Sequence, residues 1–360
     1  MAYGFRLPVL TDLTIEQQAV LNEPNAIAVS GGPGTGKSVV SLWRHIQNHS
    51  MKRRNSLLLT YTVSLEAYLK ATAKSENIDA GRNVSRTYRW TTDQRINNRT
   101  TAQFDEIIID EAQDVNRRIY ETIDSLTKMV SYSADDNQIL FPNRATSEEQ
   151  LQELFNNRRF TLNANYRNTY EVMHFVRSLF PQTIISNGQS NGEKPKLICS
   201  DGINENQIQI IKDVIDEFHN NINNIAVLVP LENHVRYWHN ELQNSGYTCS
   251  MYVNTEEEIN TIENIHVTTY KSCKGLEFDT VIIPYFNKYQ DFIDNFNVVT
   301  EKDYYVVFTR TKRNLILIDH RPTVNGNSSI PFIQNQIRNG IVEVDKRYLK
   351  TIEDDDHLPF

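Results

Sequence analysis

The sequence predicts an α/β protein of two lobes, each built on a mainly parallel sheet with flanking helices. Apolar segments of strand length alternate with segments of helical periodicity along nearly the whole chain, which is typical of parallel strands joined by crossover helices. The length of 360 residues is enough for two or three domains. Hydrophobic residues make up 39% and charged residues 23% of the chain, which excludes a disordered or fibrous protein.

The first lobe is predicted to span residues 1–160. Strands are expected at residues 27–30, 56–61, 106–110 and 129–133, because each is a short apolar run bounded by glycine or polar turn residues. Helical periodicity occupies much of the chain between them, with helices expected at residues 37–49, 65–74 and 117–127 and another around Ala19. Strand and helix therefore alternate through this lobe.

The second lobe is predicted to span residues 161–325, with the boundary between the lobes near residues 157–170. Its strands are expected at residues 196–199, 225–229, 265–269, 280–284 and 314–319. Its helices are expected at residues 169–179, 207–219, 231–245 and 301–310. Residues 326–360 are expected to form a C-terminal helix and an acidic tail.

Charge and cysteine content restrict where the protein works and what it binds. The net charge of −8 excludes a polycation that coats nucleic acid, so any nucleic-acid contact must be a local groove. Cys199, Cys249 and Cys273 lie far apart without a C-x-x-C pair, which suits a reducing compartment and gives no metal framework. The chain has no long apolar run and begins without the pattern of a secretory signal. We therefore expect a cytoplasmic protein without a membrane partner.

A glycine-rich loop predicts a nucleoside triphosphate site. The sequence GGPGTGKS fits the pattern G-x-x-x-x-G-K-[ST] and stands between a predicted strand and a predicted helix. Backbone N–H groups of such a loop face the β-phosphate, the lysine reaches the β and γ oxygens, and the serine hydroxyl binds Mg²⁺. A chance glycine-rich turn is the weaker alternative. The residues of the loop are Gly31, Gly32, Pro33, Gly34, Thr35, Gly36, Lys37 and Ser38.

Two adjacent carboxylates follow a predicted strand of the same lobe. Residues 104–114 read FDEIIIDEAQD, an apolar strand that ends at Asp110 and Glu111. Asp110 is expected to hold Mg²⁺ through water, and Glu111 to orient and deprotonate an attacking water. An acidic pair after a strand can also be a simple helix N-cap, but the nearby glycine-rich loop favours the catalytic interpretation. A nucleoside triphosphate and Mg²⁺ are the ligands that these two motifs predict.

At these residues the chain resembles the superfamily 1 helicases of the UvrD/Rep type, whose second motif is commonly DE-x-Q-D. The similarity extends over roughly residues 10–320, and further motifs follow in the family's order. They are LTIEQQ at 13–18, LLLTYTV at 57–63, SADDNQILFPNR at 133–144, LNANYRN at 162–168, VTTYKSCKGLEFDTVII at 267–283 and YVVFTRTK at 305–312. The resemblance implies two RecA-like P-loop NTPase lobes that hold MgATP between them.

The resemblance also implies roles for residues outside the glycine-rich loop. It implies that Gln17 reads the adenine edge and that Gln138 is a sensor between the γ-phosphate and nucleic acid. Five residues of the second lobe are implied to complete the ATP site. These are Tyr166 stacking on adenine, Arg167 on the γ-phosphate, Gly275 and Glu277 at the phosphate and ribose, and Arg310 as the arginine finger. For Arg167 or Arg310 taken singly, a surface salt bridge is the simpler alternative.

A second set of residues is expected to contact a nucleic-acid strand by stacking or by phosphate binding. For Tyr61 and Phe141, burial between the lobes is an equally good alternative. Arg89 belongs to a basic and aromatic segment, residues 82–99, which could instead be a solvated face. Lys271 stands where the family usually has histidine. The set is Tyr61, Thr87, Arg89, Phe141, Arg144, Thr269 and Lys271.

The chain also departs from the family in ways that affect the expected function. It has no room for the two large insertions of full-length members, and Asn143 stands where the family has a base-stacking tryptophan. We therefore expect a minimal two-lobe motor that hydrolyses ATP to move on or remodel single-stranded DNA, with RNA left open. Duplex unwinding would need a partner, such as a nuclease or another component of a repair or defence system. The alternative is a nucleotide-gated sensor of DNA ends that does not travel.

Overall fold

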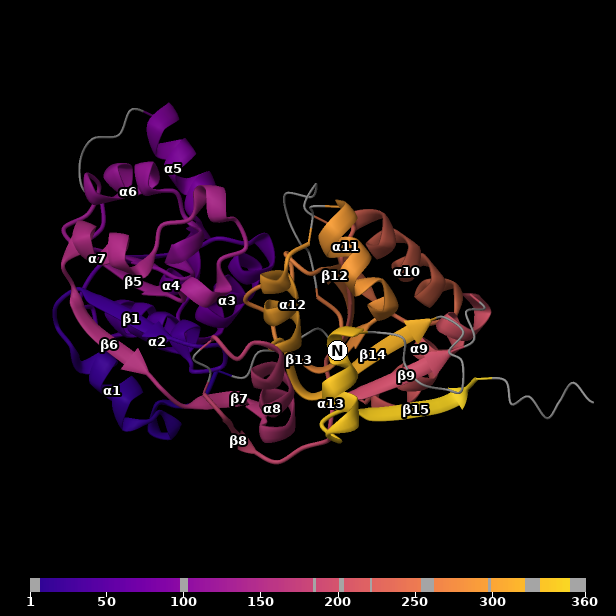
Figure 1. Cartoon of the computed structure of the whole chain (residues 1–360). Helices are drawn as coiled ribbons and strands as arrows, with labels where there is room; N and C mark the ends of the chain where they lie inside the picture. Colours follow the sequence, from indigo (N-terminus) through magenta and orange to yellow (C-terminus); the bar gives the residue numbers. More distant parts are fainter. Residues whose placement is uncertain are drawn as a thin grey trace, which may run out of the picture.

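The computed structural model describes residues 7–97, 103–183, 186–200, 204–220, 222–253, 262–296, 299–320 and 331–349. Two α/β lobes lie side by side, the first from the N-terminal part of the chain and the second from the C-terminal part (Figure 1). Each lobe holds one large parallel sheet with helices packed around it. This architecture confirms the predicted fold class of two RecA-like lobes.

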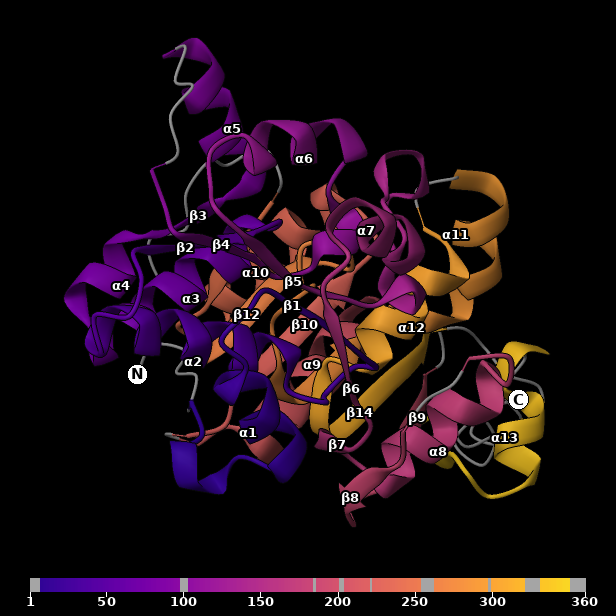
Figure 2. The same ribbon diagram turned by 90° about the vertical axis from the view of Figure 1, so that its left-hand side faces the viewer.

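The described part of the first lobe contains a six-stranded sheet in the order β3-β2-β4-β5-β1-β6, and every neighbouring pair is parallel. Figure 2 looks onto this lobe, with β2, β4, β5, β1 and β6 following one another across the sheet. The strands are β1 (Ile27–Gly31), β2 (Ser56–Thr60), β3 (Val84–Arg86), β4 (Glu106–Ile109), β5 (Val130–Ala134) and β6 (Arg158–Leu162).

The helices of the first lobe cover both faces of this sheet. One hydrophobic core forms against α1, α2 and α3, and a second forms on the opposite face against α6. Burial on both faces explains why consecutive apolar residues form the middle of β2 and most of β4, without polar alternation. The helices are α1 (Ile15–Asn22), α2 (Lys37–Ser50), α3 (Val63–Glu76), α4 (Ile78–Arg82), α5 (Thr87–Ile96), α6 (Arg117–Asp124) and α7 (Glu148–Phe155), with 3₁₀ turns η1 (Leu10–Asp12), η2 (Ala112–Asp114), η3 (Asp136–Gln138) and η4 (Pro142–Arg144).

The second lobe contains a seven-stranded parallel sheet among its described residues, in the order β11-β12-β10-β13-β14-β9-β15. Its strands are β9 (Lys196–Ser200), β10 (Ile225–Val229), β11 (Ser250–Tyr252), β12 (Ile265–Thr269), β13 (Phe278–Ile283), β14 (Thr311–His320) and β15 (Glu343–Tyr348). Its helices are α8 (Tyr170–Leu179), α9 (Asn204–Phe218), α10 (Glu232–Asn244), α11 (Tyr289–Phe296), α12 (Glu301–Phe308) and α13 (Gln334–Arg338), with 3₁₀ turns η5 (Phe286–Lys288) and η7 (Pro331–Ile333). A small separate sheet pairs β7 (Asn165–Thr169) with β8 (Gly188–Ser190).

Two expected segments differ from the structure. The expected boundary between residues 160 and 161 falls inside β6, which pairs with β1 in the first sheet. The expected C-terminal helix is the short α13, and it is followed by β15, which joins the second sheet beside β9. Both strands are rich in polar residues because they lie at sheet edges, so their sequences lack an apolar run. Residues 326–330 and the acidic tail lie outside the described residues.

The topology gathers the predicted motifs at one edge of the first sheet. β1, β4 and β5 are parallel, and β5 lies between the other two. The glycine-rich loop follows β1, Asp110 follows β4, and Asp135 follows β5, so the carboxyl ends of adjacent strands carry all three. Within the described ranges, no helix is both long and apolar enough to span a membrane.

Candidate nucleotide-binding site between the lobes

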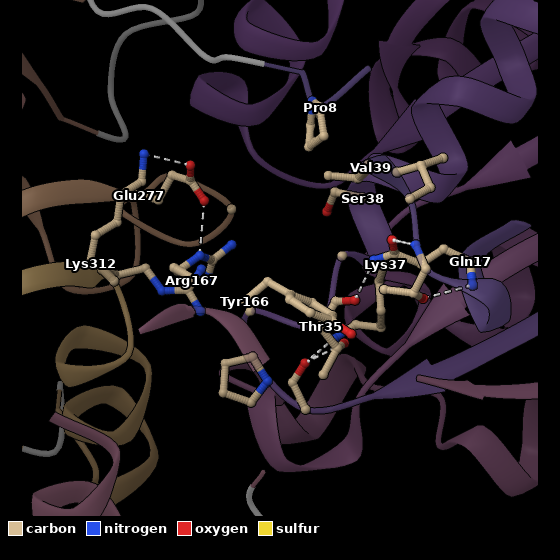
Figure 3. A pocket seen from close by; sticks show the side chains of 18 of the residues that line it. Pro8, Gln17, Thr35, Lys37, Ser38, Val39, Tyr166, Arg167, Glu277 and Lys312 are labelled. Carbon is tan, nitrogen blue, oxygen red and sulfur yellow. Dashed lines mark hydrogen bonds and ion pairs between the residues drawn. The ribbon is translucent and has the colours of Figure 1, made fainter. Parts of the chain in front are cut away.

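A cavity of about 380 Å³ lies between the two lobes and is lined by both. Figure 3 shows Gln17, Lys37 and Ser38 of the first lobe on one side, and Arg167, Glu277 and Lys312 of the second lobe on the other. The predicted nucleotide residues that line it are Gln17, Gly32, Pro33, Gly34, Thr35, Gly36, Lys37, Ser38, Glu111, Gln138, Tyr166, Arg167, Gly275, Glu277 and Arg310. Gly31 ends β1 directly beneath the loop.

The glycine-rich loop has a backbone that only glycine adopts easily. Gly34 has φ +73° and Gly36 has φ +92°, both in the left-handed region. A Cβ at Gly34 would lie 2.3 Å from Oδ1 of Asn165, and one at Gly36 would lie 2.3 Å from Nε2 of Gln17. The loop then opens α2 at Lys37, so the first N–H groups of that helix are available to an anion.

The Lys37 ammonium lies at the mouth of the loop. Its Nζ donates to the carbonyl oxygens of Gly31 at 2.6 Å and Gly32 at 3.1 Å, and lies 3.8 Å from Oδ2 of Asp135. The side chain is 6% exposed. A buried cation next to a ring of backbone N–H groups favours phosphate binding.

Gln17 ties α1 to the loop. Its N–H and side-chain Oε1 form a reciprocal capping box with Thr14, and its Nε2 donates to the Thr35 carbonyl at 3.0 Å. Gln17 is thus held against the loop at the wall of the cavity. The family's adenine contact stays a prediction for this side chain.

Asp110 has a free carboxylate oxygen at the position expected for a metal ligand. Ser133 Oγ donates to its Oδ1 at 2.5 Å, whereas the buried Oδ2 has no hydrogen-bond partner among the described residues. Burial and the Glu111 carboxylate raise the pKa of Asp110, and the hydroxyls of Ser133 and Ser38 oppose that rise. The oxygens of Asp110 and Ser38 are hard ligands of the kind that Mg²⁺ takes.

Asp110 and Ser38 fit a metal ion that is held partly by the phosphates of a bound nucleotide. The described residues contain no group of three or more His, Cys, Asp or Glu side chains that could hold a metal ion. Mg²⁺ at nucleotide sites is commonly bound by one or two protein oxygens together with phosphate oxygens and water. The residues present therefore fit a metal that binds together with the nucleotide.

Glu111 is held by strained backbone and by a cation from the other lobe. Its φ is +57°, a left-handed conformation that costs free energy in a non-glycine residue and that occurs at functional sites. Gln113 Nε2 donates to Glu111 Oε2 at 2.6 Å, and Lys274 Nζ lies 3.3 Å from the same oxygen. Burial raises the pKa of Glu111, but Lys274, Lys37 and Gln113 together outweigh it and lower the pKa.

Gln138 and Arg310 meet across the boundary between the lobes. Arg310 Nη2 donates to Oε1 of Gln138 at 2.9 Å, and Nε donates to the Val306 carbonyl at 3.0 Å. Arg310 is 1% exposed, and burial together with Arg167 lowers its pKa to about 10. A surface salt bridge, the simpler alternative for this arginine, does not describe so buried a side chain.

Arg167 and Lys312 share one carboxylate on the second-lobe side of the cavity. Arg167 Nε lies 2.9 Å from Oε2 of Glu277, and Lys312 Nζ lies 2.8 Å from Oε1. Burial opposes ionisation of Glu277, but these two cations lower its pKa to about 2. Beside them Tyr166 is 53% exposed, and its N–H donates to the Gly34 carbonyl at 2.9 Å (Figure 3). An aromatic ring therefore stands free next to the glycine-rich loop.

Sequence reasoning missed several residues of the site. Lys274 is 1% exposed, and its Nζ lies 2.5 Å from Oδ2 of Asp114. Lys312 was missed as well, although it pairs with Glu277. The resemblance drew attention to their motif neighbours Gly275 and Arg310. The sequence pattern predicts that a lysine inside a polar motif lies at the surface. The position of each lysine within its motif is therefore the only sequence signal for a role in the site.

Four of the predicted strand-binding residues come together at the boundary between the lobes. The Tyr61 ring lies 5.4 Å from the Phe141 ring, centre to centre, and Lys271 Nζ from the second lobe lies 5.4 Å from the centre of the Phe141 ring. The exposed Arg144 is close enough to Tyr61 to affect its pKa. We call Tyr61, Phe141, Arg144 and Lys271 the junction cluster.

The other three predicted strand-binding residues lie apart from this cluster or are buried. Thr87 is buried and donates from Oγ1 to the Thr60 carbonyl at 3.1 Å. Thr269 is 5% exposed, and its hydroxyl donates to Ser272 Oγ at 2.9 Å. The Thr87 hydroxyl thus joins the start of α5 to the end of β2, and the Thr269 hydroxyl stabilises the turn after β12. Arg89 is exposed on α5. Arg99, the last arginine of the basic segment, lies outside the described residues.

Comparison with known proteins points to helicases. The family model for the Schlafen group 3 DNA/RNA helicase domain matches residues 24–194, which run from β1 into the start of the second lobe. A protein of Acanthamoeba polyphaga mimivirus, provisionally named ATP-dependent DNA helicase R568, is 28% identical over 242 residues. That match covers 58% of this chain but 33% of the mimivirus protein, so the chain spans about a third of the length of this relative.

Solved structures of helicases are also similar, at low identity. The arterivirus nonstructural protein 10 helicase has a TM-score of 0.43 at 12% identity, covering 84% of this chain and 61% of that one. The PRRSV helicase has a TM-score of 0.44 at 12% identity, covering 88% and 57%. The C-terminal domain of a possible DNA helicase from Lactobacillus plantarum WCFS1 has a TM-score of 0.37 at 15% identity, covering 51% and 100%.

The sequence matches support a helicase superfamily as the wider group of this chain. They do not single out the UvrD/Rep type. The expected membership is therefore supported at the level of the superfamily.

Proposed function

We propose that this chain is an ATP-dependent, helicase-like motor that hydrolyses ATP between its lobes and uses the cycle to move along or remodel single-stranded DNA. The observation that carries the proposal is the composite cavity. It brings the loop lysine Lys37, the carboxylate Glu111 and the second-lobe residues Arg167 and Arg310 to one place. The order of the motifs favours the UvrD/Rep type within the superfamily.

Nucleotide binding follows from the walls of the cavity. The loop N–H groups bind the β- and γ-phosphates. The Lys37 ammonium binds the same phosphates and gives up its present contacts with the Gly31 and Gly32 carbonyl oxygens. Tyr166 offers its exposed ring to the base, and Gln17 supports the loop from behind. Mg²⁺ at Ser38 and Asp110 would neutralise charge on the β- and γ-phosphate oxygens.

Hydrolysis requires a base, a water-positioning group and a cation for the developing charge. Glu111 accepts the proton of the attacking water as the bond from the γ-phosphorus to the ADP oxygen breaks. Gln138 lines the same cavity as Glu111 and orients that water. Arg310 and Arg167 stabilise the charge on the γ-phosphoryl oxygens. Since both arginines belong to the second lobe, the rate depends on how the lobes are placed.

Strand binding is assigned to the junction cluster. Aromatic rings stack on bases and cations follow phosphates in sequence-tolerant single-strand grooves. Tyr61 and Phe141 come from the first lobe and Lys271 from the second, so a strand on this cluster contacts both lobes. A change in lobe spacing during ATP turnover would then move one strand contact relative to the other. We further propose that unwinding of duplex needs a partner protein.

The experiment is steady-state ATP hydrolysis by the purified chain with and without single-stranded DNA, with Lys37→Ala and Glu111→Gln as blanks. We expect magnesium-dependent hydrolysis that the strand stimulates, and loss of it in both variants. A rate of hydrolysis that is the same with and without the strand would contradict the motor and favour a nucleotide-gated sensor. The same assay with RNA decides which strand is the better partner.

A further inference from the structure

Lys274 is only 1% exposed and, like Arg310, connects the two lobes among the contacts described above. It belongs to the second lobe, in the loop between β12 and β13, yet its contacts are in the first lobe. Nζ lies 2.5 Å from Asp114 Oδ2, 2.6 Å from the Gln138 carbonyl oxygen and 3.3 Å from Glu111 Oε2. One side chain therefore contacts the proposed base and the residue proposed to orient water.

The loop that carries Lys274 also reaches both ligand sites. Lys271 lies over the Phe141 ring in the junction cluster, and Gly275 and Glu277 line the nucleotide cavity. The Lys274 carbonyl accepts a hydrogen bond from Thr62 Oγ1 at 3.3 Å, and Thr62 follows Tyr61 of the junction cluster. A strand that displaces this loop would therefore also move Lys274.

The charge of Lys274 is fixed by its surroundings. Burial alone would lower its pKa, but Asp114 and Glu111 reverse this effect and raise the pKa. Asp114 is itself 0% exposed, so the ammonium is its compensating charge. A charged group with three contacts at these distances has little freedom, and its position follows the position of its loop.

We propose that Lys274 is a positioning residue that couples occupancy of the junction cluster to ATP hydrolysis, by holding Glu111 and Gln138 in the arrangement that hydrolysis needs. The inference rests on the proposed function, because it assumes that a strand binds the junction cluster. It adds a residue and a route to that function: from Lys271 along the loop to Lys274, and from there to the base.

The test uses a variant that removes the link without leaving a bare buried charge. Lys274→Met alone leaves Asp114 uncompensated and endangers folding, so it is combined with Asp114→Asn. Lys302→Met is the matched control. Lys302 also connects the second lobe to the first, because its Nζ donates to the Asp136 carbonyl at 3.4 Å. Unlike Lys274, Lys302 is exposed, and it does not line the cavity. Thermal unfolding of each variant verifies that it is folded.

Two readouts separate coupling from simple stability. The first is the strand-stimulated kcat together with the KM for ATP. The second is the ratio of strand Kd values with and without a non-hydrolysable ATP analogue, which measures the coupling between the two sites. For Lys274→Met/Asp114→Asn we expect a fall in stimulated kcat on the order of 10²-fold with KM within about threefold of wild type, and a Kd ratio close to one. Lys302→Met should match wild type in both readouts.

The result that overturns the inference is a folded double variant whose stimulated kcat and Kd ratio equal those of wild type. Lys274 would then serve only to neutralise Asp114. Failure of the proposed function is measured separately: no strand would then stimulate ATP hydrolysis by the wild-type protein. That result would overturn both statements, whereas stimulation of wild type and double variant alike would overturn the inference alone.

Discussion

Arg310 of the second lobe donates from Nη2 to Oε1 of Gln138 in the first lobe across 2.9 Å. Gln138 in turn donates from Nε2 to Asp135 Oδ2 at 2.6 Å, and Asp135 Oδ2 lies 3.8 Å from the Lys37 ammonium. A continuous polar chain thus connects the arginine of one lobe to the phosphate-binding lysine of the other. Hydrolysis at such a site depends on both lobes at once.

Replacing Arg310 should separate catalysis from binding. An arginine supplied to a transferring phosphoryl group contributes on the order of 10³ to 10⁵ in rate. We therefore expect Arg310→Ala to lower kcat for ATP hydrolysis by about 10³-fold while the Kd for nucleotide changes far less. Arg313→Ala is the matched control, because Arg313 is exposed and does not line the cavity. Equal loss of binding and rate in Arg310→Ala would show that Arg310 supports the fold of the site instead.

Two glycines of the loop should respond differently to alanine. At Gly34 the φ of +73° and the approach of Asn165 Oδ1 to 2.3 Å from an added Cβ predict strain, with a cost of about 1 to 3 kcal/mol in the free energy of unfolding. A Cβ at Gly32 would meet no atom of the described residues within 4 Å, so Gly32→Ala should stay within about 1 kcal/mol of wild type. Denaturant unfolding without nucleotide measures both, and equal stability of the two variants would refute the strained-loop account.

The junction cluster should contribute stacking to strand binding. Loss of a base-stacking ring costs about 1 to 3 kcal/mol, so Phe141→Ala should weaken the Kd for single-stranded DNA by roughly 5- to 150-fold. Tyr247→Ala is the control, because this half-buried tyrosine of the second lobe bonds Asp216 and takes no part in the cluster. Fluorescence anisotropy with labelled oligonucleotides gives both values. Unchanged binding by Phe141→Ala would assign the ring to packing between the lobes.

Lys271 should contribute a phosphate contact. Each phosphate neutralised on a single strand changes the slope of log K against log salt by about 0.7. We expect Lys271→Gln to reduce the slope by about that amount and to weaken binding to all sequences alike. A salt titration of strand affinity measures it, with Lys302→Gln as an exposed lysine for comparison. An unchanged slope would mean that Lys271 only stacks on Phe141.

Two buried histidines should make stability depend on pH. Burial lowers the pKa of both His45 and His266 from 6.5 to about 3. Between pH 3 and pH 6.5 these histidines are protonated in the unfolded chain but not in the folded one. The free energy of unfolding therefore has its highest value above pH 6.5 and falls as the pH drops toward 3. Each histidine contributes about 1.4 kcal/mol per pH unit in that window. His45→Gln should therefore lower the slope by this amount in urea unfolding between pH 6 and 4, and His219→Gln, at an exposed site, should leave it unchanged.

The sequence predicted the interior strands well because both faces of each are buried. The runs at β2, β4 and β10 are mostly apolar, and their predicted and observed bounds differ by at most one residue. The edge strands β6 and β15 escaped prediction, since their polar residues face solvent and no alternation marks them. β6 belongs to the first sheet and ends at Leu162, which lies within the expected boundary region of residues 157–170.

The site was predictable where the chemistry forces a residue type and not where tertiary contacts create it. A phosphate-binding loop requires glycine at positive φ and a lysine, so residues 31–38 stand out in the sequence. Nothing local marks Lys274, which becomes a buried cation only when the lobes meet. The same holds for the left-handed backbone at Glu111, because its strain is sustained by surroundings distant in sequence.

In the proposed function, ATP hydrolysis between the lobes drives movement along a strand. The most direct test is the steady-state rate of ATP hydrolysis at fixed low salt, with saturating single-stranded DNA of increasing length and Lys37→Ala as the blank. A motor predicts a rate that rises with strand length until end effects fade. A rate that saturates at the length of the binding site, or no hydrolysis despite measurable binding of MgATP, would contradict the motor.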